Sequence, residues 1–409
     1  MVGGGRGQRV LFLTHHLPWP ASSGGRLREA QLLGRLAHRF DIDLVAISKV
    51  PEADRRAVDE ALVRGIHAHV FAAHQSPRPR ISPHVRRHRS ASARAHLASW
   101  WSRHQDCLVH VEGHYLLGLL PPPARSCALV VEHNIESALF GQRADLATSG
   151  RERRRLRSAA ALTQDTERLA WRTAASVGAI TPEDCAVIRR HAPFAAVHHL
   201  PNGADHLHAA PLPCADRDAA VSDLLFVGNF AYLPSQDAAR WLLTAIFPAV
   251  TASRPSTTLT FAGSGPPAWL VEAARVDPRV RVTGPVPDLT GWLDAAQVVV
   301  CPLRIGGGVK VKVLEALSRG RAVVTTSVGV QGLGELPAGA VLVRDDASSI
   351  AQSCLSLLAS AEIRRSQQEC AQDAVRLLPT WDQAADALAR VWGSWAGVTR
   401  RPDLAVTPR

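Results

Sequence analysis

The chain has 409 residues, of which 46% are hydrophobic and 20% charged; the composition is ordinary for a globular protein, but the length suggests two domains. It contains no run of about 18 or more apolar residues, which argues against a membrane-spanning helix, and its N-terminal residues lack the cleavage pattern of a signal peptide. A formal net charge of +11 suggests an anionic partner: nucleic acid, an acidic membrane surface or a phosphorylated ligand.

The cysteines indicate reduced thiols in a cytoplasmic protein. There are seven, an odd number, and no two of them form a CxxC pair. This pattern does not fit a disulfide framework. The cysteines are Cys107, Cys127, Cys185, Cys214, Cys301, Cys354 and Cys370.

Apolar runs alternate with amphipathic segments through the first 200 residues. Residues 9–14 (RVLFLT) are typical of a buried parallel strand, and a 3.6-residue apolar period then predicts a helix from about Arg26 to Phe40. The alternation continues and predicts a doubly wound parallel sheet. Further strands are expected at 42–48, 67–72, 107–111, 127–131, 176–180 and 196–200, and further helices at about 52–65, 151–175 and 182–190.

A basic segment, 76–104, interrupts this rhythm and ends with Trp100 and Trp101 on an expected helix. One interpretation is a solvated excursion with the two aromatic side chains packed onto the domain. The alternative is a surface helix over 86–103 that rests on anionic lipid headgroups, with tryptophans at the interface. No OB- or RRM-like module is visible, so we expect no nucleic-acid partner.

The second half of the chain repeats the α/β alternation. Residues 204–220 show no period and are predicted to link an N-terminal domain over 1–203 to a C-terminal domain over 221–378. The segment 379–409 is expected to contain a helix that packs back towards the N-terminal domain, followed by a tail. The fold class is therefore α/β, with two Rossmann-like domains in series. Strands of the second domain are expected at 223–228, 257–262, 279–283, 297–302, 321–325 and 341–344.

A glycine-rich turn at 301–316, CPLRIGGGVKVKVLEA, stands out in the second domain. The chain has only three lysines, and two of them, Lys310 and Lys312, lie in this turn. Ammonium groups, glycine backbone N–H groups and a helix N-terminus together suit a phosphate. The stretch predicts a phosphate site in which Glu315 accepts hydrogen bonds from hydroxyl groups.

Two further positions are candidates at strand ends. Gly24 and Gly25 open a helix, so their N–H groups could face an anion, although a flexible loop is equally compatible. His133 follows the strand 127–131 at its C-terminal end, where open α/β sheets bind ligands. Its neighbour Glu132 is expected either to orient His133 or to face solvent.

Other motifs are weak or absent. Residues 263–268 (GSGPPA) resemble GxGxxG, but the two prolines and the lack of a following acid favour a plain turn. No HExxH or CxxC motif is present and no DxD-like carboxylate pair stands out, so no metal site is expected. The absence of GxSxG and Walker loops argues against a hydrolase triad or a P-loop enzyme.

Taken together, the motifs resemble those of the GT-B glycosyltransferases, specifically the retaining enzymes of glycosyltransferase family 4. In the N-terminal half the resemblance rests on 18–37 (PWPASSGGRLREAQLLGRLA) and 130–137 (VVEHNIES). In the C-terminal half it rests on 200–205 (LPNGAD), 224–242 and, most specifically, 280–333. It implies GT-B architecture, in which two Rossmann-like domains face each other across a cleft.

In the N-terminal domain the resemblance assigns two elements. Gly24 and Gly25 match the loop that approaches the donor phosphates, and His133 resembles the histidine placed near the transferred sugar.

In the C-terminal domain, Glu315 matches the second acid of the family's Glu-x7-Glu element, which holds the donor ribose. Gly284 lies where the family holds the nucleotide base, and Gly228 with Asn229 matches the turn before the donor pocket. The first acid of the element falls on Gly307, and Asn229 stands where relatives often carry Arg.

The acid missing at Gly307 is the one that contacts the donor sugar in relatives, and the donor phosphates lack both the Arg at Asn229 and the Lys that relatives carry soon after the Gly228 turn. Arg304, Lys310 and Lys312, with the backbone of Gly306, Gly307 and Gly308, are expected to supply the binding charge instead. His133 and Lys312 are the residues predicted to take part in catalysis.

The resemblance thus implies a retaining transferase that moves a sugar from a nucleotide-diphosphate sugar to a lipid-linked or polysaccharide acceptor. No cofactor is expected, and the location would be cytoplasmic, at the inner face of the cell membrane. Two alternatives stay open: a GT-B sugar-nucleotide epimerase, and a catalytically degenerate sugar-nucleotide-binding or scaffold protein. The sequence leaves the sugar, the nucleotide, the acceptor and the oligomeric state open.

Overall fold

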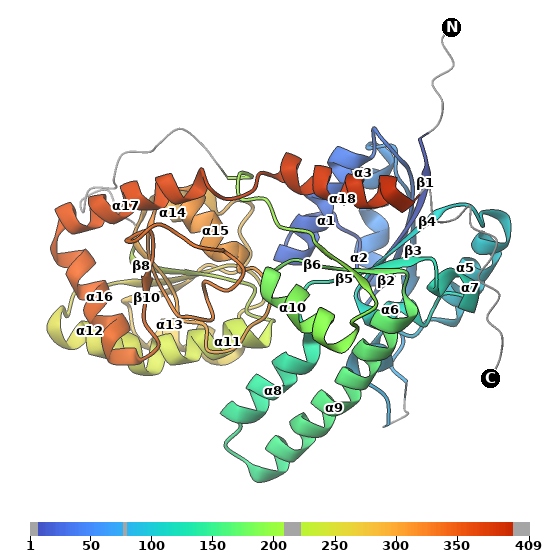
Figure 1. The fold of residues 1–409 in the computed structure, drawn as a ribbon. Helices are drawn as coiled ribbons and strands as arrows, with labels where there is room; N and C mark the ends of the chain where they lie inside the picture. The colour runs from blue at the N-terminus through green and yellow to red at the C-terminus, as the bar shows by residue number, and fades with distance from the viewer. Residues whose placement is uncertain (1–6, 77–79, 208–221, 396–409) are drawn as a thin grey trace, which may run out of the picture. The chain divides into compact units, whose positions relative to one another are not determined.

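The computed structural model divides the chain into two compact units (Figure 1). Unit 1 contains the chain up to Asn202 together with the residues from Trp381 onward, and unit 2 contains Gly203–Thr380. The residues that the structure describes are 7–76, 80–207 and 222–395.

The predicted linker, 204–220, falls for the most part on 208–221, outside the described residues. Its first residues are part of unit 2. There the backbone N–H of Ala204 donates to the carbonyl oxygen of Pro379 over 2.9 Å, and the hydroxyl of Ser318 donates to the carbonyl oxygen of Ala204.

Unit 1 is built on a seven-stranded parallel sheet in the order β3-β2-β1-β4-β5-β6-β7. The central strands are buried on both faces, as their nearly continuous apolar sequences predict. The strands are β1 (Arg9–Thr14), β2 (Asp41–Ser48), β3 (His67–Ala72), β4 (Leu108–Glu112), β5 (Ala128–Glu132), β6 (Ser176–Ala179) and β7 (Ala196–His199).

Helices cover both faces of this sheet. Alternate residues of β1 point to opposite faces: Val10 and Phe12 pack with α1, α3 and α18, whereas Leu11 and Leu13 pack with α5 and α6. The helices are α1 (Gly24–Leu36), α2 (Pro51–Arg56), α3 (Val58–Leu62), α4 (Pro83–Arg87), α5 (Ala91–Arg103), α6 (His114–Leu117), α7 (Pro122–Arg125), α8 (Glu136–Leu146), α9 (Gly150–Thr173), α10 (Pro182–His191) and α18 (Trp381–Trp395).

Unit 2 has a six-stranded parallel sheet in the order β10-β9-β8-β11-β12-β13 and one main apolar core. Its strands are β8 (Ser222–Val227), β9 (Leu259–Ala262), β10 (Val280–Val282), β11 (Ala296–Cys301), β12 (Ala322–Thr325) and β13 (Leu342–Val343). Its helices are α11 (Leu233–Trp241), which continues through a π-helical turn (Leu242–Ile246) into α12 (Phe247–Ser253), and α13 (Ala268–Val276), α14 (Thr290–Asp294), α15 (Val311–Ser318), α16 (Ala347–Ala359) and α17 (Ala361–Val375). The predicted α/β class with parallel sheets is confirmed.

The basic segment before β4 packs onto unit 1. Trp100 is only 4% exposed and donates its Nε1–H to Asp43 over 2.9 Å, and Trp101 is half-buried against the same core. The lipid-facing interpretation of 86–103 is therefore wrong for Trp100, because this indole is held inside the domain. The structure supports the other interpretation, in which the aromatic side chains pack onto the fold.

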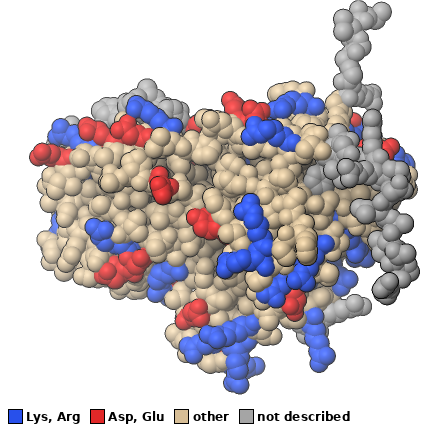
Figure 2. Space-filling view, viewed as in Figure 1, with Lys and Arg blue, Asp and Glu red and all other residues tan. Residues whose placement is uncertain are grey.

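A different basic surface projects from unit 1. Helices α8 and α9 run side by side away from the sheet (Figure 1), and their end carries a group of cationic side chains (Figure 2). The arginines in the first two turns of α9 are all exposed. They are Arg151, Arg153, Arg154, Arg155 and Arg157.

Candidate functional site

Each sheet has one point where its strand order reverses. In unit 1 this point lies between β1 and β4, and in unit 2 between β8 and β11. Open α/β sheets bind ligands outside the carboxyl ends of the strands at such a point, because the connections on either side leave in opposite directions. The predicted residues that follow these strand ends are therefore the ones to inspect in each unit.

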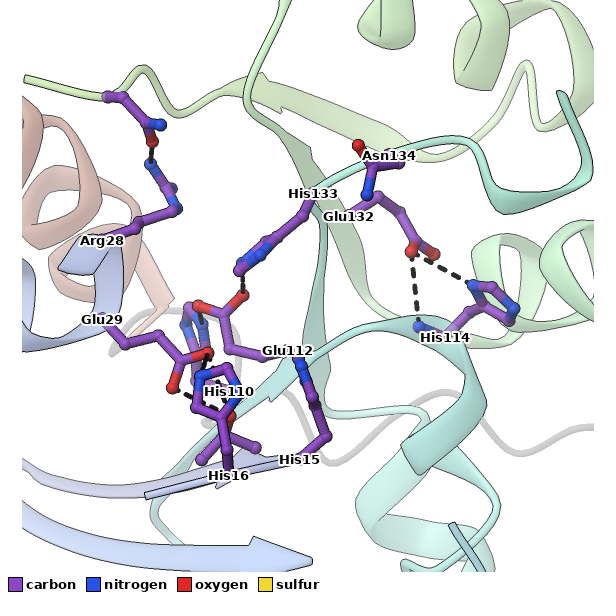
Figure 3. A network of polar contacts seen from close by, with 12 residues as sticks. His15, His16, Arg28, Glu29, His110, Glu112, His114, Glu132, His133 and Asn134 are labelled. Atoms are coloured by element: carbon purple, nitrogen blue, oxygen red, sulfur yellow. Dashed lines mark hydrogen bonds and ion pairs between the residues drawn. The ribbon is translucent and has the colours of Figure 1, made fainter. Parts of the chain in front are cut away.

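In unit 1, the ends of β1, β4 and β5 bring together acidic and imidazole side chains (Figure 3). His16 follows β1, Glu112 is the last residue of β4, and His133 follows β5. Glu29, on the buried side of α1, completes the cluster. Glu29 and Glu112 are almost fully buried, whereas the side chain of His133 is 19% exposed.

The closest contact in the cluster joins His133 to Glu112. His133 Nε2 lies 2.6 Å from Glu112 Oε2, and His110 Nε2 lies 2.8 Å from Glu112 Oε1. Burial alone would raise the pKa of Glu112, but the charge of protonated His133 and the hydrogen bonds from His110 and His133 outweigh it and hold this pKa below its usual range. Conversely, burial would lower the pKa of His133, and the negative charge and hydrogen bond of Glu112 raise it above its ordinary value.

Glu29 is held separately. Its two carboxylate oxygens accept the Thr14 hydroxyl hydrogen bond at 3.0 and 2.8 Å, and Oε1 lies 3.1 Å from His16 Nε2. The next residue towards the N-terminus, Arg28, is 2% exposed and donates from Nη1 to Asn202 Oδ1 over 2.6 Å and to the Pro201 carbonyl over 2.9 Å. The segment Pro201-Asn202, which follows β7, is thus tied to α1.

The two glycines lie at the first turn of α1. Ser23 caps the helix, and its hydroxyl accepts from the Arg26 N–H at 3.5 Å. A β-carbon on Gly25 would lie 3.7 Å from His133 Nδ1 and 3.5 Å from His16 Cε1. The imidazole nitrogen of His133 that does not contact Glu112 is therefore the one next to the helix start, where backbone N–H groups and the helix dipole favour an anion.

Glu132 does neither of the things expected of it. Its side chain is buried, accepts from Trp171 Nε1 at 2.8 Å and contacts His114 Nδ1 at 3.1 Å. It therefore does not orient His133, and it does not face solvent (Figure 3).

Two sets of three side chains in the described part of unit 1 are close enough to hold a metal ion. Their candidate ligand atoms lie within 4.8 Å of one another in each set. The carboxylate oxygens involved already accept hydrogen bonds from protein side chains, so we describe the cluster as a hydrogen-bonded network. The sets are His15, His16 and Glu29, and Glu29, Glu112 and His133.

In unit 2, Lys312 presents its amine at the point where the strand order reverses. Nζ lies 3.1 Å from the Ser235 hydroxyl and 4.6 Å from the centre of the Phe226 ring, and a β-carbon on Gly228 would lie 3.1 Å from it. Burial lowers the pKa of this amine, and the nearby Cys301 and Glu315 partly offset the effect. The amine is therefore a partly desolvated cation beside the turn that follows β8.

Two helices begin near this amine. Helix α15 starts at Val311 after β11, and α11 starts at Leu233 after β8. Their N-terminal ends add positive potential to that of Lys312. Glu315 lies three residues after Lys312 on α15, hence on the same side of the helix, and its Oε1 is 3.4 Å from His206 Nε2.

Lys310 is turned into the glycine loop. Its Nζ donates to the carbonyl oxygens of Gly307 and Gly308 at 3.1 and 2.7 Å, and lies 3.4 Å from Gln331 Oε1. A β-carbon on Gly306 would come within 2.8 Å of the Lys310 side chain. Lys310 thus holds the loop in shape, and Lys312 is the lysine whose amine faces the strand ends.

The remaining predicted residues surround this region without converging on Lys312. Arg304 is paired with Asp237 at 2.6 Å, and the Asn229 carboxamide accepts from the Ala231 N–H at 3.0 Å. Gly284 follows β10 with φ of +70°, and among the described residues, its two chain neighbours aside, no atom would lie within 4 Å of a β-carbon there. The space beside its backbone is therefore open.

The GSGPPA turn has a structural role. Gly263 has a φ of +137°, and a β-carbon on it would come within 2.0 Å of the Gly228 carbonyl oxygen. The turns after β8 and β9 can approach this closely only with glycine. The expectation that this motif is a plain turn agrees with the geometry.

Sequence reasoning missed several members of these sites. A signal existed for Glu112, since an acid that ends an apolar run at a strand terminus lies where ligands bind. The others had no local signal, because each is placed by contacts between distant segments. The missed side chains are Glu29, His110 and Glu112 in unit 1 and Phe226 and Ser235 in unit 2.

Comparisons with known proteins agree with this description. Residues 222–360 match the family model of glycosyl transferases group 1. Sucrose-phosphate synthase from Thermosynechococcus elongatus is 17% identical with a TM-score of 0.70, covering 96% of this chain and 100% of that one. HepE from Anabaena, solved with UDP-glucose, is 14% identical with a TM-score of 0.66 and covers 95% and 100%. WaaG, a glycosyltransferase of lipopolysaccharide biosynthesis, is 15% identical with a TM-score of 0.65 and covers 94% and 99%.

No curated protein sequence matches the chain. The resemblance to GT-B glycosyltransferases is nevertheless confirmed, because unit 2 matches a glycosyl transferase family model and the whole chain superposes on structures of this fold. Among the described residues, none of the helices has the length and apolar character needed to cross a bilayer.

Proposed function

We propose that this chain, which carries a group 1 glycosyl transferase domain on the GT-B fold, is a retaining glycosyltransferase of family 4. It would move a sugar from a nucleotide-diphosphate sugar to a lipid-linked or polysaccharide acceptor at the cytoplasmic face of the cell membrane, in cell-envelope or exopolysaccharide synthesis. The matched family model and the fold support the reaction class.

The observation that carries the proposal is the position of the Lys312 amine. Breaking a sugar–diphosphate bond leaves negative charge on the departing phosphate, and a fixed cation beside helix N-termini stabilises that charge as it develops. Lys312, with the starts of α11 and α15, provides this combination where ligands bind in an open sheet. No protein nucleophile is required if the departing phosphate takes the acceptor's proton.

Unit 2 is proposed to bind the nucleotide part of the donor. HepE was solved with UDP, with UDP-glucose and with UDP and glucose, which favours a nucleotide-sugar donor for a chain of the same fold. Glu315 would accept the ribose hydroxyls, and the open backbone at Gly284 would hold the base. In unit 1, the start of α1 would contact the donor phosphates, and His133 the transferred sugar.

The first experiment is a thermal-shift screen of the protein against UDP-, GDP- and ADP-sugars, followed by a turnover assay with the stabilising donor. A ligand bound only by the native state raises the melting temperature by mass action. Lys312→Met should abolish the shift and lower the turnover about 100-fold. Arg275→Met, which removes an exposed cation from α13 of the same unit, should change neither. Equal shifts for all donors and for both variants would reject the proposal.

Two other functions remain as alternatives, because Gly307 replaces the acid that relatives use near the donor sugar. A degenerate binding or scaffold protein would bind the donor without any turnover, and Lys312→Met would leave pathway output in cells unchanged. A sugar-nucleotide epimerase would convert the donor with no acceptor present. NMR detection of the anomeric proton of donor and product separates the three outcomes.

An anionic membrane surface as partner is favoured by the arginines at the start of α9. Cations at a helix N-terminus oppose the helix dipole, so their clustering there favours an anionic contact outside the helix. A variant with Arg153, Arg154 and Arg155 changed to Gln should float less with vesicles containing anionic lipid, whereas a variant with Arg94 and Arg103 of α5 changed to Gln should float as the wild type does. Equal flotation of all three proteins would reject this surface.

A further inference from the structure

A chain of hydrogen bonds joins the last helix of unit 1 to His133. Trp392 Nε1, on α18, lies 3.2 Å from His110 Nδ1. His110 Nε2 lies 2.8 Å from Glu112 Oε1, and Glu112 Oε2 lies 2.6 Å from His133 Nε2. The four side chains come from α18, β4 and the loop after β5, and all of them belong to unit 1.

The indole N–H of Trp392 and the carboxylate of Glu112 fix the direction of every hydrogen bond in this network. An indole N–H can only donate, so His110 Nδ1 accepts and the proton of neutral His110 lies on Nε2. That proton is donated to Glu112, which as a carboxylate only accepts. Glu112 Oε2 therefore accepts from the Nε2–H of His133, and the remaining nitrogen of His133, Nδ1, is left on the side of Gly25.

Three members of this hydrogen-bond network are held rigidly in the core, and only the fourth, His133, reaches solvent. Trp392, His110 and Glu112 are each 1% exposed. The His110 ring stacks on Phe12 with centroids 4.3 Å apart and planes 10° apart, and the Trp392 ring meets both of them edge-on. His133, with 19% of its side chain exposed, is thus the accessible end of a network whose other members cannot turn.

A purely structural role explains this arrangement poorly. A buried carboxylate between two imidazoles loses its hydration, and apolar residues of similar volume usually serve stability as well or better. In metal sites, a carboxylate that accepts one ring N–H of a histidine fixes its tautomer and orientation so that the opposite nitrogen can act, and the pair of Glu112 and His133 has the same arrangement, with Nδ1 next to the start of α1. Other charged groups near His133 are Arg28, which disfavours its protonated form, and Glu29, which favours it.

We propose that Glu112 is a positioning residue, which, with His110 and Trp392 behind it, holds the His133 ring so that Nδ1 faces the start of α1 and the substrate. The inference rests on the proposed function for the task of His133, but the geometry it asserts does not require turnover. It assigns roles to three side chains that do not contact the substrate themselves.

The first test is histidine NMR on the full chain labelled with ¹⁵N, with His133→Gln used to assign the His133 signals. In the wild type, neutral His133 should carry its proton on Nε2 alone. Glu112→Leu should give a mixture of tautomers. Glu112→Gln should lower the pKa of His133 and move its proton to Nδ1, because the single carboxamide oxygen accepts from His110 and the carboxamide N–H then donates to His133 Nε2. Unchanged tautomer and unchanged pKa in both variants would overturn the proposal.

Glu132→Gln is the matched control. Glu132 is likewise a buried carboxylate that contacts one indole N–H and one imidazole, but these belong to Trp171 and His114. Its substitution should leave the His133 tautomer as it is in the wild type. An equal change in the Glu132 and Glu112 variants would mean that any buried charge in this region suffices, and would overturn the specific role of Glu112.

Trp392→Phe keeps the proposal testable if the Glu112 variants fail to fold. It removes only the indole N–H, so the ¹⁵N signal of His110 Nδ1 should shift as this nitrogen loses its donor, while Glu112 keeps the His110 proton on Nε2; an unchanged Nδ1 signal would overturn the role given to Trp392. With an active donor and acceptor pair, Glu112→Gln should lower kcat about 10- to 100-fold with the donor KM unchanged. A higher donor KM at constant kcat would instead make Glu112 a determinant of donor affinity and would overturn its role. Absence of turnover in the wild type would reject the proposed function but not the NMR result.

Discussion

Replacing Glu136 by glutamine should stabilise unit 1 at neutral and alkaline pH but much less at acidic pH. Glu136 is the first residue of α8, and its side chain is 18% exposed. Its Oε1 accepts from Asn134 Nδ2 at 3.3 Å, and its Oε2 lies 3.5 Å from His84 Nδ1. Burial, together with the negative charges of neighbouring carboxylates, raises the pKa of Glu136 from 4.5 to about 7.

The imidazole beside it supplies no compensating charge. Burial lowers the pKa of His84 to about 3, so the ring is neutral wherever Glu136 titrates. Folding with Glu136 ionised therefore carries a cost that folding with Glu136 protonated does not.

The magnitude follows from linkage. Between the unfolded pKa of 4.5 and the folded pKa of about 7, the native state binds a proton that the unfolded state has lost, so stability falls as pH rises. At 1.36 kcal/mol per unit, the whole shift corresponds to about 3.4 kcal/mol, of which about 2.5 kcal/mol develops between pH 5 and pH 8. The glutamine side chain has the same shape and does not titrate, so it does not show this loss.

Differential scanning calorimetry of the wild type and of Glu136→Gln at several pH values measures the effect. The advantage of the variant should grow by about 2.5 kcal/mol from pH 5 to pH 8. Glu60→Gln, which changes an exposed carboxylate on α3 of the same unit, should give a difference that is flat with pH. A flat difference for Glu136→Gln as well would show that the carboxylate is not penalised in the native state, and would refute the reasoning.

Three other predictions concern unit 2. Lys312→Met should lower donor turnover about 100-fold in initial-rate assays, and wild-type rates would contradict this. The melting temperature of the ligand-free variant should not fall below that of the wild type, because burying the amine destabilises the native state. Iodoacetamide at pH 8 should modify the half-buried Cys370 before Cys301, because burial raises the pKa of the Cys301 thiol to about 12. Equal labelling of the two cysteines in peptide mass spectrometry would contradict this prediction. In urea unfolding, Gly263→Ala should lower the free energy of unfolding by about 3 kcal/mol and Gly284→Ala by about 1 kcal/mol. Both glycines have positive φ, but only at Gly263 would the added β-carbon also meet a backbone oxygen. The reverse order would disprove this explanation.

The sequence was most informative where structure depends on neighbouring residues. The apolar run before Thr14 and its later counterparts predict buried parallel strands, because a strand covered on both faces has no polar alternation. The start of α1 was predicted two residues late, at Arg26, because the glycine pair was taken as part of the loop. The helix begins at Gly24, capped by Ser23.

The sequence was less informative about side-chain direction at the two sites. Lys310 and Lys312 were expected to act together on a phosphate, yet residues two apart near a helix start point to different sides. Lys310 is the residue before the helix and turns back into the loop, whereas Lys312 is inside the first turn and points to Ser235.

The network behind His133 could not be read from local patterns at all. Trp392 and His110 are 282 positions apart, and no periodicity links them. An isolated histidine at a strand end was visible in the sequence, but the carboxylate and the second imidazole that orient it become apparent only when β4 and β5 lie side by side.

The return of α18 to unit 1 has a consequence for the order in which the protein is made. Trp381 and Trp392 are almost fully buried in the core formed by β1 and α1, and Arg35 pairs with Asp382 across 347 positions of the chain. On the ribosome, unit 2 is therefore complete before the first unit has its last helix. Until then the apolar face that α18 covers, and the inner end of the network leading to His133, stay open to solvent or to a chaperone. Unit 1, whose synthesis begins first, therefore completes its fold after unit 2.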